Sequence, residues 1–204
     1  LLSECLAATR AAWIQVSRSK FRVAETEGTV SIPALKIAGK TDRVDEAEGL
    51  VRVVDYKTGY LDDSPTAYYT GRKLQLELYL YAASEGKTPA GAFYFPAADT
   101  FAKEGSGARF AMKGFYNAEQ ISAFDTAVAE GEKSELFDGA RAADKGMTGE
   151  AFSDFLEYGY FVSEQAEAEM KEGNFAPSPY GDACDRCKLK SLCAFTGDAR
   201  QENT

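Results

Sequence analysis

The spacing of hydrophobic and polar positions predicts helices and strands that alternate along the chain. Near the N-terminus, Leu2, Leu6, Trp13 and Ile14 form a helical stripe with intervening alanines. Other runs alternate with the period of a strand, and two of them flank a polar turn that contains Gly49, as in a hairpin. The predicted strands cover 21–30, 35–44, 50–54, 92–95 and 109–112. The first predicted helix runs from residue 2 to an end near 17–19, and the others cover about 66–84, 117–132 and 149–172. We therefore expect an α/β or α+β fold with a central mixed β-sheet flanked by helices.

The hairpin places charged residues at the rim of an apolar face. A turn centred just before Glu48 sets Asp42 opposite Val53, and Asp55 follows two residues further along on the same face. Diagonal neighbours in such a pair lie about 7 Å apart, so the two carboxylates can converge on one cation. Lys57 shares this face by the strand period. A slip of one residue would move one carboxylate to the other face, so the prediction depends on the register.

These charges fit one kind of chemistry and one structural role. Carboxylates are hard oxygen ligands that suit Mg²⁺ or Mn²⁺, and a lysine beside the ion can hold or activate an attacking water. That combination favours metal-assisted phosphodiester hydrolysis. The alternative is that Asp42 with Arg43, and Asp55 with Lys57, form ordinary ion pairs on the two strands. The spacing alone leaves both interpretations open.

Composition narrows the chemistry further. The chain has 204 residues and no histidine, which excludes Ser-His-Asp and Cys-His nucleophile systems and any imidazole base. The formal charge is −9, but the acidic excess lies in residues 101–183, so the first hundred residues and the end of the chain can approach a polyanion. No stretch resembles a membrane span of about 18 apolar residues or a secretory leader. We expect a soluble cytoplasmic protein with one main core. We also expect this chain to be a fragment of a longer protein.

Three of the four cysteines lie close together near the C-terminus. Cys184, Cys187 and Cys193 are spaced so that one zinc ion or iron–sulfur cluster could collect several thiolates. Because the chain has no histidine, a zinc site would need a fourth cysteine or a carboxylate. Free thiols without a cofactor are the alternative. We expect Cys5, the remaining cysteine, to be a buried helix residue.

Three sequence blocks carry a family resemblance. Residues 39–45, 53–59 and 74–82 follow one another in an order that resembles the RecB-like branch of the PD-(D/E)XK nuclease superfamily. The likeness is closest to the nuclease domains of AddB- and RexB-type subunits of bacterial ATP-dependent helicase-nucleases. The resemblance implies a restriction-endonuclease-like nuclease core over residues 1–180 and a cysteine-containing tail over 181–204.

The resemblance also implies roles for the site residues. Asp42 and Asp55 are expected to bind Mg²⁺ or Mn²⁺, with the backbone carbonyl of Tyr56 as a further metal contact. Lys57 is expected to be the catalytic lysine. Two further residues, Gln75 and Tyr79, are spaced i, i+4 on one helix face and are expected to face the active site. The alternative for Tyr79 is a place in the core stripe with Leu76 and Leu80. Arg72 and Lys73, one turn earlier, are candidates for phosphate contact.

For the tail, the resemblance favours an iron–sulfur cluster held by Cys184, Cys187 and Cys193. The fourth ligand is expected upstream of this chain, as is the acidic or histidine residue that completes the family's metal site. Within the chain, Glu4 is a weak substitute, and Glu25 and Glu27, on the strand before the hairpin, could face either the site or solvent.

The implied function is that of a metal-dependent exodeoxyribonuclease domain of a helicase-nuclease in double-strand break repair and recombination. The expected partners are linear DNA ends, single-stranded DNA and an AddA-like helicase subunit, without a membrane. One alternative is a stand-alone iron–sulfur exonuclease of the CRISPR-adaptation type. The other is a non-catalytic module that binds DNA ends or a helicase.

Overall fold

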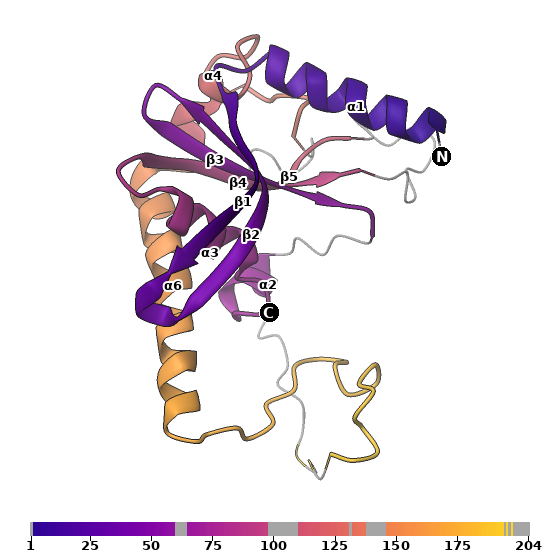
Figure 1. Cartoon of the computed structure of the whole chain (residues 1–204), viewed down its shortest axis with the longest axis vertical. Coiled ribbons are helices and arrows are strands. Elements are labelled where there is room, and N and C mark those ends of the chain that lie inside the picture. The colour runs from indigo at the N-terminus through magenta and orange to yellow at the C-terminus, as the bar shows by residue number, and fades with distance from the viewer. Residues whose placement is uncertain are drawn as a thin grey trace. The chain divides into compact units, whose positions relative to one another are not determined.

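The described part of the chain is a mixed β-sheet with helices on both faces. The structure, a computed structural model, describes residues 2–59, 65–97, 110–130, 132–137, 146–193, 195 and 197. Across these ranges, six strands form one sheet in the order β1-β2-β3-β4-β5-β6 (Figure 1). This arrangement confirms the predicted α/β fold class with a central mixed sheet.

The elements follow the predicted alternation in outline. The strands are β1 (Arg22–Ile32), β2 (Ile37–Ala47), β3 (Leu50–Lys57), β4 (Thr88–Pro96), β5 (Lys113–Asn117) and β6 (Gly146–Met147). The α-helices are α1 (Leu2–Ser17), α2 (Pro65–Tyr69), α3 (Gln75–Ala83), α4 (Ile121–Phe124) and α6 (Gly149–Lys171), with 3₁₀ turns η1 (Pro33–Leu35) and η2 (Ala118–Gln120).

The connections place β3 in the middle of the sheet. Strands β1, β2 and β3 form an antiparallel meander, whereas β3 and β4 run parallel. A parallel pair needs a crossover, and α2 and α3 lie in the segment that provides it. Strand β5 then pairs antiparallel with β4 and parallel with β6. The end of β3 is therefore flanked by a strand on each side and followed by the crossover helices.

The β2–β3 turn differs from the predicted one. Its two central residues, Glu48 and Gly49, have positive φ angles of 48° and 85°, as a two-residue hairpin loop of the primed type requires. The ladder consequently pairs Val44 with Val53. The predicted pairing of Asp42 with Val53 was wrong by two positions.

This correction strengthens the geometric argument. A change of two positions keeps each side chain on the same face, because side chains alternate with a period of two. Continuing the observed register by one position beyond its last pair, Arg43 with Val54, sets Asp42 opposite Asp55 rather than diagonal to it.

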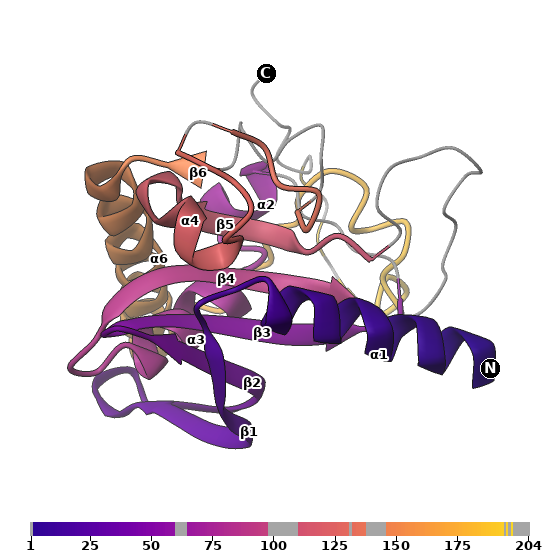
Figure 2. The same cartoon turned by 90° about the horizontal axis from the view of Figure 1, so that it is seen from above.

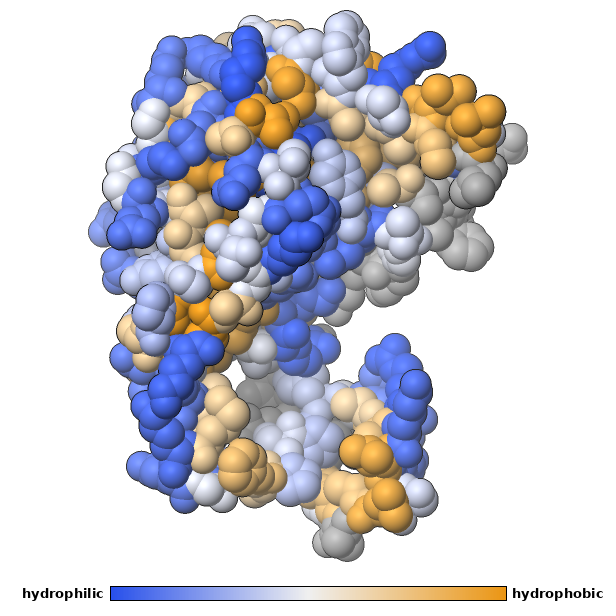
Figure 3. All heavy atoms as spheres, viewed as in Figure 1, coloured by the Kyte–Doolittle hydropathy of each residue, from blue (hydrophilic) through white to orange (hydrophobic). Residues whose placement is uncertain are grey.

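Helix α1 forms where it was predicted but buries a different face. Leu2, Leu6 and Trp13 are 74%, 63% and 68% exposed, and Figure 3 shows hydrophobic colour at the N-terminal end of this helix. Instead, the small residues and Ile14 pack on the core, since alanines allow the helix close to the aromatic side chains beneath it. Cys5 is exposed, so the expectation that it is buried was wrong.

The predicted helix over 66–84 is interrupted. Gly71, with a φ of 71°, ends the α2 turn, and a methyl group at this position would lie 2.9 Å from Cγ1 of Val162. A residue other than glycine would be strained there. The break between α2 and α3 lets α3 start at Gln75.

Two further predictions shift in the second half. The strand predicted over 109–112 is observed at Lys113–Asn117; residue 109 lies outside the described residues. The helix predicted over 117–132 ends at Phe124, because Asp125 is extended and its carboxylate accepts hydrogen bonds from Ser134 and the Ala127 N–H.

The sheet separates two hydrophobic cores, and Figure 2 shows the strands and helices around them. One core lies between the sheet and helices α1 and α4 and is rich in aromatic residues, among them Phe21, Phe93 and Phe124. The other lies between the sheet and helices α2, α3 and α6 and contains Val53 and Tyr94. Successive residues of β2 and β3 therefore enter different cores.

The chain divides into two compact units, Leu1–Ser163 and Glu164–Thr204, with the boundary inside α6. The domain boundary expected near residue 180 stays a prediction. Among the described residues, no helix is long and apolar enough to span a bilayer.

Candidate active site

Four of the predicted site residues gather where β3 ends, on the face covered by α3. Asp42 comes from β2, Asp55 and Lys57 from β3, and Gln75 from the first position of α3. The two strands bring the acids together through their register, and the break before α3 aims the first turn of that helix at the strand end. The predicted convergence on one face is therefore present.

Asp42 is held by the neighbouring strand. Its Oδ2 accepts a hydrogen bond of 2.7 Å from the backbone N–H of Tyr56, which uses one of the two carboxylate oxygens. The side chain of Tyr56 lies on the other face, where its hydroxyl accepts a 2.7 Å hydrogen bond from Arg43 Nη1. The backbone of Tyr56 thus belongs to the site, while its ring anchors the opposite face.

Asp55, Lys57 and Gln75 form a closed triangle of contacts. Lys57 Nζ lies 2.6 Å from Asp55 Oδ2 and donates to Gln75 Oε1 at 3.3 Å. The amide of Gln75 turns its Nε2 to Asp55 Oδ1 at 3.1 Å. Because one amide contacts both partners with its two ends, Gln75 fixes the orientation of the carboxylate and of the ammonium together.

The charge on Asp55 is incompletely compensated. Burial raises the pKa of Asp55, the hydrogen bond and charge of Lys57 oppose that rise, and the negative charge of Asp42 adds to it. A buried carboxylate with a second acid beside it favours the presence of a cation. The donor set of Asp42, Asp55 and the backbone of Tyr56 consists of hard oxygens, which fits Mg²⁺ or Mn²⁺.

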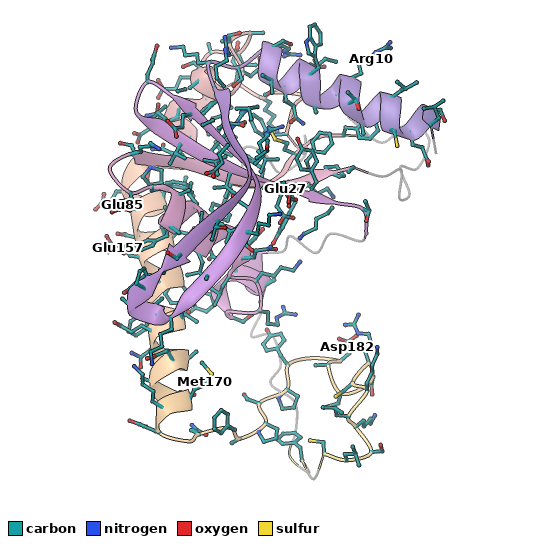
Figure 4. All side chains as sticks on the ribbon, viewed as in Figure 1. Arg10, Glu27, Glu85, Glu157, Met170 and Asp182 are labelled. Atoms are coloured by element: carbon teal, nitrogen blue, oxygen red, sulfur yellow. The ribbon has the colours of Figure 1, made fainter. Side chains whose placement is uncertain are left out.

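No third protein acid completes this set among the residues that the structure describes. In the described ranges, no three His, Cys, Asp or Glu side chains lie close enough together to hold a metal ion. Glu25 folds over Gly28, and Glu27 forms an ion pair of 2.5 Å with Lys40 (Figure 4). Glu4 lies on α1. None of the three proposed substitutes therefore joins Asp42 and Asp55.

Tyr79 packs on the core that lies beneath α3. Its ring lies against Gly39 of β2, where a methyl group would lie 2.6 Å from the Tyr79 Cε1 atom. The same residue packs against the core between the sheet and α3. The core contact considered for Tyr79 is therefore present, and its role at the active site stays a prediction.

Tyr94 is a site residue that sequence reasoning missed. It pairs with Asp55 across the parallel strands, and Lys57 Nζ lies 5.4 Å from the centre of its ring. Burial raises the pKa of Tyr94 to about 12, with added contributions from Asp55, Glu77 and Tyr79. The sequence shows a tyrosine within the apolar run 92–95. That this tyrosine lies beside Asp55 follows only from the pairing of β3 with β4.

The cysteine tail is an open series of turns. Cys184 is half-buried, and Cys187 and Cys193 are exposed. The N–H of Cys187 bonds to the carbonyl of Cys184 at 3.4 Å, and the N–H of Cys193 bonds to the carbonyl of Leu189 at 2.9 Å. Within the described part of the tail, the three thiols do not form a group placed to hold a metal. The cluster stays a prediction.

The central strand of the mixed sheet ends in Asp-x-Lys, with an acid from the preceding strand and a glutamine from the crossover helix beside it, which is the arrangement that the sequence predicts for a nuclease site. Comparison with known families agrees: the model of the PD-(D/E)XK nuclease superfamily matches residues 1–194. The chain belongs to this superfamily.

Curated relatives carry a more specific name, that of the B subunit of an ATP-dependent helicase/deoxyribonuclease. The chain is 32% identical, over 79% of its length, to this subunit from Caldanaerobacter subterraneus subsp. tengcongensis. It is 26% identical, over 83% of its length, to the protein of the same name from Bacillus subtilis. A segment of 76 residues is 43% identical to the Symbiobacterium thermophilum protein. The chain spans only 17% of the length of the first two relatives.

Proposed function

We propose that this chain is the metal-dependent nuclease domain of a bacterial helicase-nuclease and that it cleaves DNA by phosphodiester hydrolysis. The observation that carries the proposal is the single amide of Gln75 that holds both Asp55 and Lys57, with Asp42 beside them. An ordinary pair of surface charges would not need a half-buried helix terminus to orient it. The names of the relatives support the wider assignment.

In this proposal Asp42, Asp55 and the backbone carbonyl of Tyr56 hold Mg²⁺ or Mn²⁺. The bound ion would supply Lewis-acid stabilisation of the charge that develops on the phosphate. Lys57 holds or activates the attacking water with its ammonium group, and Gln75 keeps that group and the Asp55 carboxylate in place. Tyr79 lines the site and helps to position the strand.

The proposed substrate is linear DNA, entered as a single strand from an end, and the proposed mode is exonucleolytic. The proposed partner is a helicase subunit of the AddA-like type, with a role in double-strand break repair and recombination in the cytoplasm. These proposals rest on the relatives' names and on the sequence resemblance.

Cleavage of linear DNA with Mg²⁺ or Mn²⁺ tests the proposal. We expect the protein to degrade a labelled linear substrate, EDTA to stop the reaction, and Asp55→Asn to lower the rate by about a thousandfold or more. The matched control is Asp154→Asn, which removes an exposed carboxylate from α6 and should leave the rate unchanged. Equal cleavage by wild type and Asp55→Asn would contradict the assignment.

For the tail, we propose that Cys184, Cys187 and Cys193 supply three ligands of an iron–sulfur cluster in the intact protein. The support is the spacing of the thiols and the family resemblance. Iron and acid-labile sulfide, measured after anaerobic purification, should be present in the wild type and lost in Cys187→Ser. Stoichiometric zinc instead of iron would contradict this proposal.

A further inference from the structure

A second lysine lies beside the site, and neither the family match nor the triangle of contacts assigns it a role. Lys73 follows the Gly71 turn, and its backbone N–H bonds to the carbonyl of Ala67 at 3.0 Å. Its Nζ lies 5.4 Å from the centre of the Tyr94 ring. Both the main chain and the ammonium group of Lys73 are therefore held in place, unlike those of an unrestrained surface lysine.

Two lysines lie over the ring of Tyr94, and only one of them is paired with an acid. Lys57 and Lys73 each place an ammonium 5.4 Å from its ring centre. Lys57 is paired with Asp55 at 2.6 Å, whereas Lys73 forms no ion pair with any carboxylate of the described ranges. A cation–π contact positions an ammonium but leaves its charge in place. Lys73 is thus the cation of this site whose charge no described acid neutralises.

The charge of Lys73 reaches the reacting end of the site. Lys73 shares the Tyr94 ring with Lys57. The ammonium group of Lys57 lies 2.6 Å from Asp55 Oδ2, so Lys73 lies beside the proposed metal ligands. Arg72, the neighbouring cation, is exposed, and its Nε donates a 3.1 Å hydrogen bond to Thr70 Oγ1. Arg72 and Lys73 were both candidates for phosphate contact from the sequence, but the structure gives them different surroundings.

We propose that Lys73 binds a backbone phosphate of the DNA strand next to the scissile one, with the Tyr94 ring as the support that aims its ammonium group. The inference rests on the proposed nuclease function. A lysine is a compact point charge with three donors, and it suits a phosphate oxygen without reading the base. Substrate binding would supply the anion that the described residues do not.

A structural role would predict something different. If Lys73 only packed its aliphatic stem on Tyr94, Lys73→Met would preserve that packing and behave as the wild type does. If it binds phosphate, Lys73→Met should weaken DNA binding and Lys73→Arg should retain it. Lys133→Met, which removes an exposed lysine from the segment 132–137, is the matched control for net charge.

The test is the salt dependence of DNA binding. A labelled single-stranded oligonucleotide is titrated with each protein in EDTA, where no cleavage occurs, and fluorescence anisotropy gives the dissociation constant between about 50 and 200 mM salt. One lost phosphate contact should reduce the slope of log K against log salt by about 0.7. We expect this reduction, with roughly tenfold weaker binding at low salt, in Lys73→Met and not in Lys73→Arg or Lys133→Met.

The outcomes separate the inference from the proposed function. A wild-type slope in Lys73→Met, with native circular dichroism, would overturn the inference and leave the nuclease assignment standing. If Lys73→Met does not fold, Lys73→Gln replaces it, and the same comparison decides. Absence of DNA binding by the wild type would contradict the proposed function first, and the inference with it.

Discussion

Two buried carboxyl groups on opposite faces of the sheet are neutralised in different ways. Asp45 of β2 and Glu77 of α3 are both 0% exposed. Asp45 lies on the face covered by α1. Glu77 belongs to α3 and lies on the other face, which carries the candidate site. The difference between them lies in what neutralises each carboxyl group.

Asp45 is neutralised by arginines. Its Oδ1 lies 3.0 Å from Arg43 Nε and its Oδ2 lies 2.8 Å from Arg52 Nε. Arg52 in turn stacks 4.6 Å from the centre of the Phe21 ring. Burial lowers the pKa of Arg52 to about 10, and the charge of Asp45 opposes that change. This face therefore balances its buried carboxylate with two arginines of the fold, although Asp45 Oδ1 and several of the arginine nitrogens have no hydrogen-bond partner among the described residues.

Glu77 has no such partner. Neither of its carboxyl oxygens has a hydrogen-bond partner among the described residues, and Gly159 of α6 lies against it, where an added methyl group would lie 3.1 Å from Glu77 Cβ. Burial raises the pKa of Glu77 to about 8. At neutral pH the group is mostly protonated, so a proton does what the arginines do for Asp45.

The comparison explains why the candidate site lies on the α3 face. On that face Glu77 has no cationic side chain of the described residues beside it, whereas Asp55 is paired with Lys57 and has Asp42 as a second acid nearby. The opposite face pairs the buried acid Asp45 with two arginines. Two acids that share one paired lysine at the end of a strand leave a negative charge that a bound metal ion would offset.

The largest expected effect concerns Glu77 and pH. Its pKa is raised in the folded state, so its contribution to stability is full below about 4.5 and is lost as the pH rises towards 8. At about 1.4 kcal/mol per unit, that loss is roughly 5 kcal/mol at most. Glu77→Gln should remove this pH dependence, as measured by urea unfolding from about pH 5 to 9.

The control for Glu77 is Glu85→Gln, since Glu85 lies exposed near the end of α3 (Figure 4). This variant should keep the pH dependence of the wild type. Equal pH dependence in the wild type and in Glu77→Gln would show that the buried carboxyl is not held protonated.

Removing the carboxylate of Asp45 from between its two arginines should lower the free energy of unfolding by slightly less. Asp45→Asn leaves two buried arginines without a counter-charge, and we expect the free energy of unfolding to fall by about 3–5 kcal/mol. Chemical denaturation measures this loss. A loss under about 1 kcal/mol would mean that the two arginines do not need Asp45, and the contrast with Glu77 would fail.

A smaller effect is expected from Gln75, an uncharged residue that holds Asp55 and Lys57 in position. Gln75→Leu keeps the volume but releases Asp55 and Lys57, and kcat for DNA cleavage should fall by about 10- to 100-fold with little change in stability. Gln165→Leu, an exposed position of α6, is the control. An unchanged kcat would assign Gln75 to packing alone.

Much of the fold could be predicted from hydrophobic spacing, but local backbone chemistry could not. The strands around Asp42 and Asp55 were predicted because apolar and polar residues alternate along much of their length, and alternation favours a strand. The register was not, because it depended on Glu48 taking a positive φ beside Gly49. The stripe in α1 was right for Ile14 and the alanines, which pack on the core, and wrong for Leu2, Leu6 and Trp13, which are exposed; spacing alone does not favour alanine over leucine or tryptophan.

Local pattern could predict the part of the site that rests on two adjacent strands, whereas Gln75 on the crossover helix was placed at the site through the family resemblance. Asp42, Asp55 and Lys57 share a hairpin, so a short-range argument brings them together. Tyr94 and Lys73 meet the site through the parallel pairing of β3 with β4 and through the Gly71 break. Those contacts depend on tertiary packing, which no local pattern contains.

Binding of Mn²⁺ is the measurement that tests the central claim most directly. Titration followed by electron paramagnetic resonance counts free and bound ion without any need for cleavage. We predict that the wild type and Asp154→Asn bind Mn²⁺, and that Asp42→Asn and Asp55→Asn each bind it at least about tenfold more weakly. Unchanged binding in both site variants would contradict the claim that these two carboxylates form the metal site.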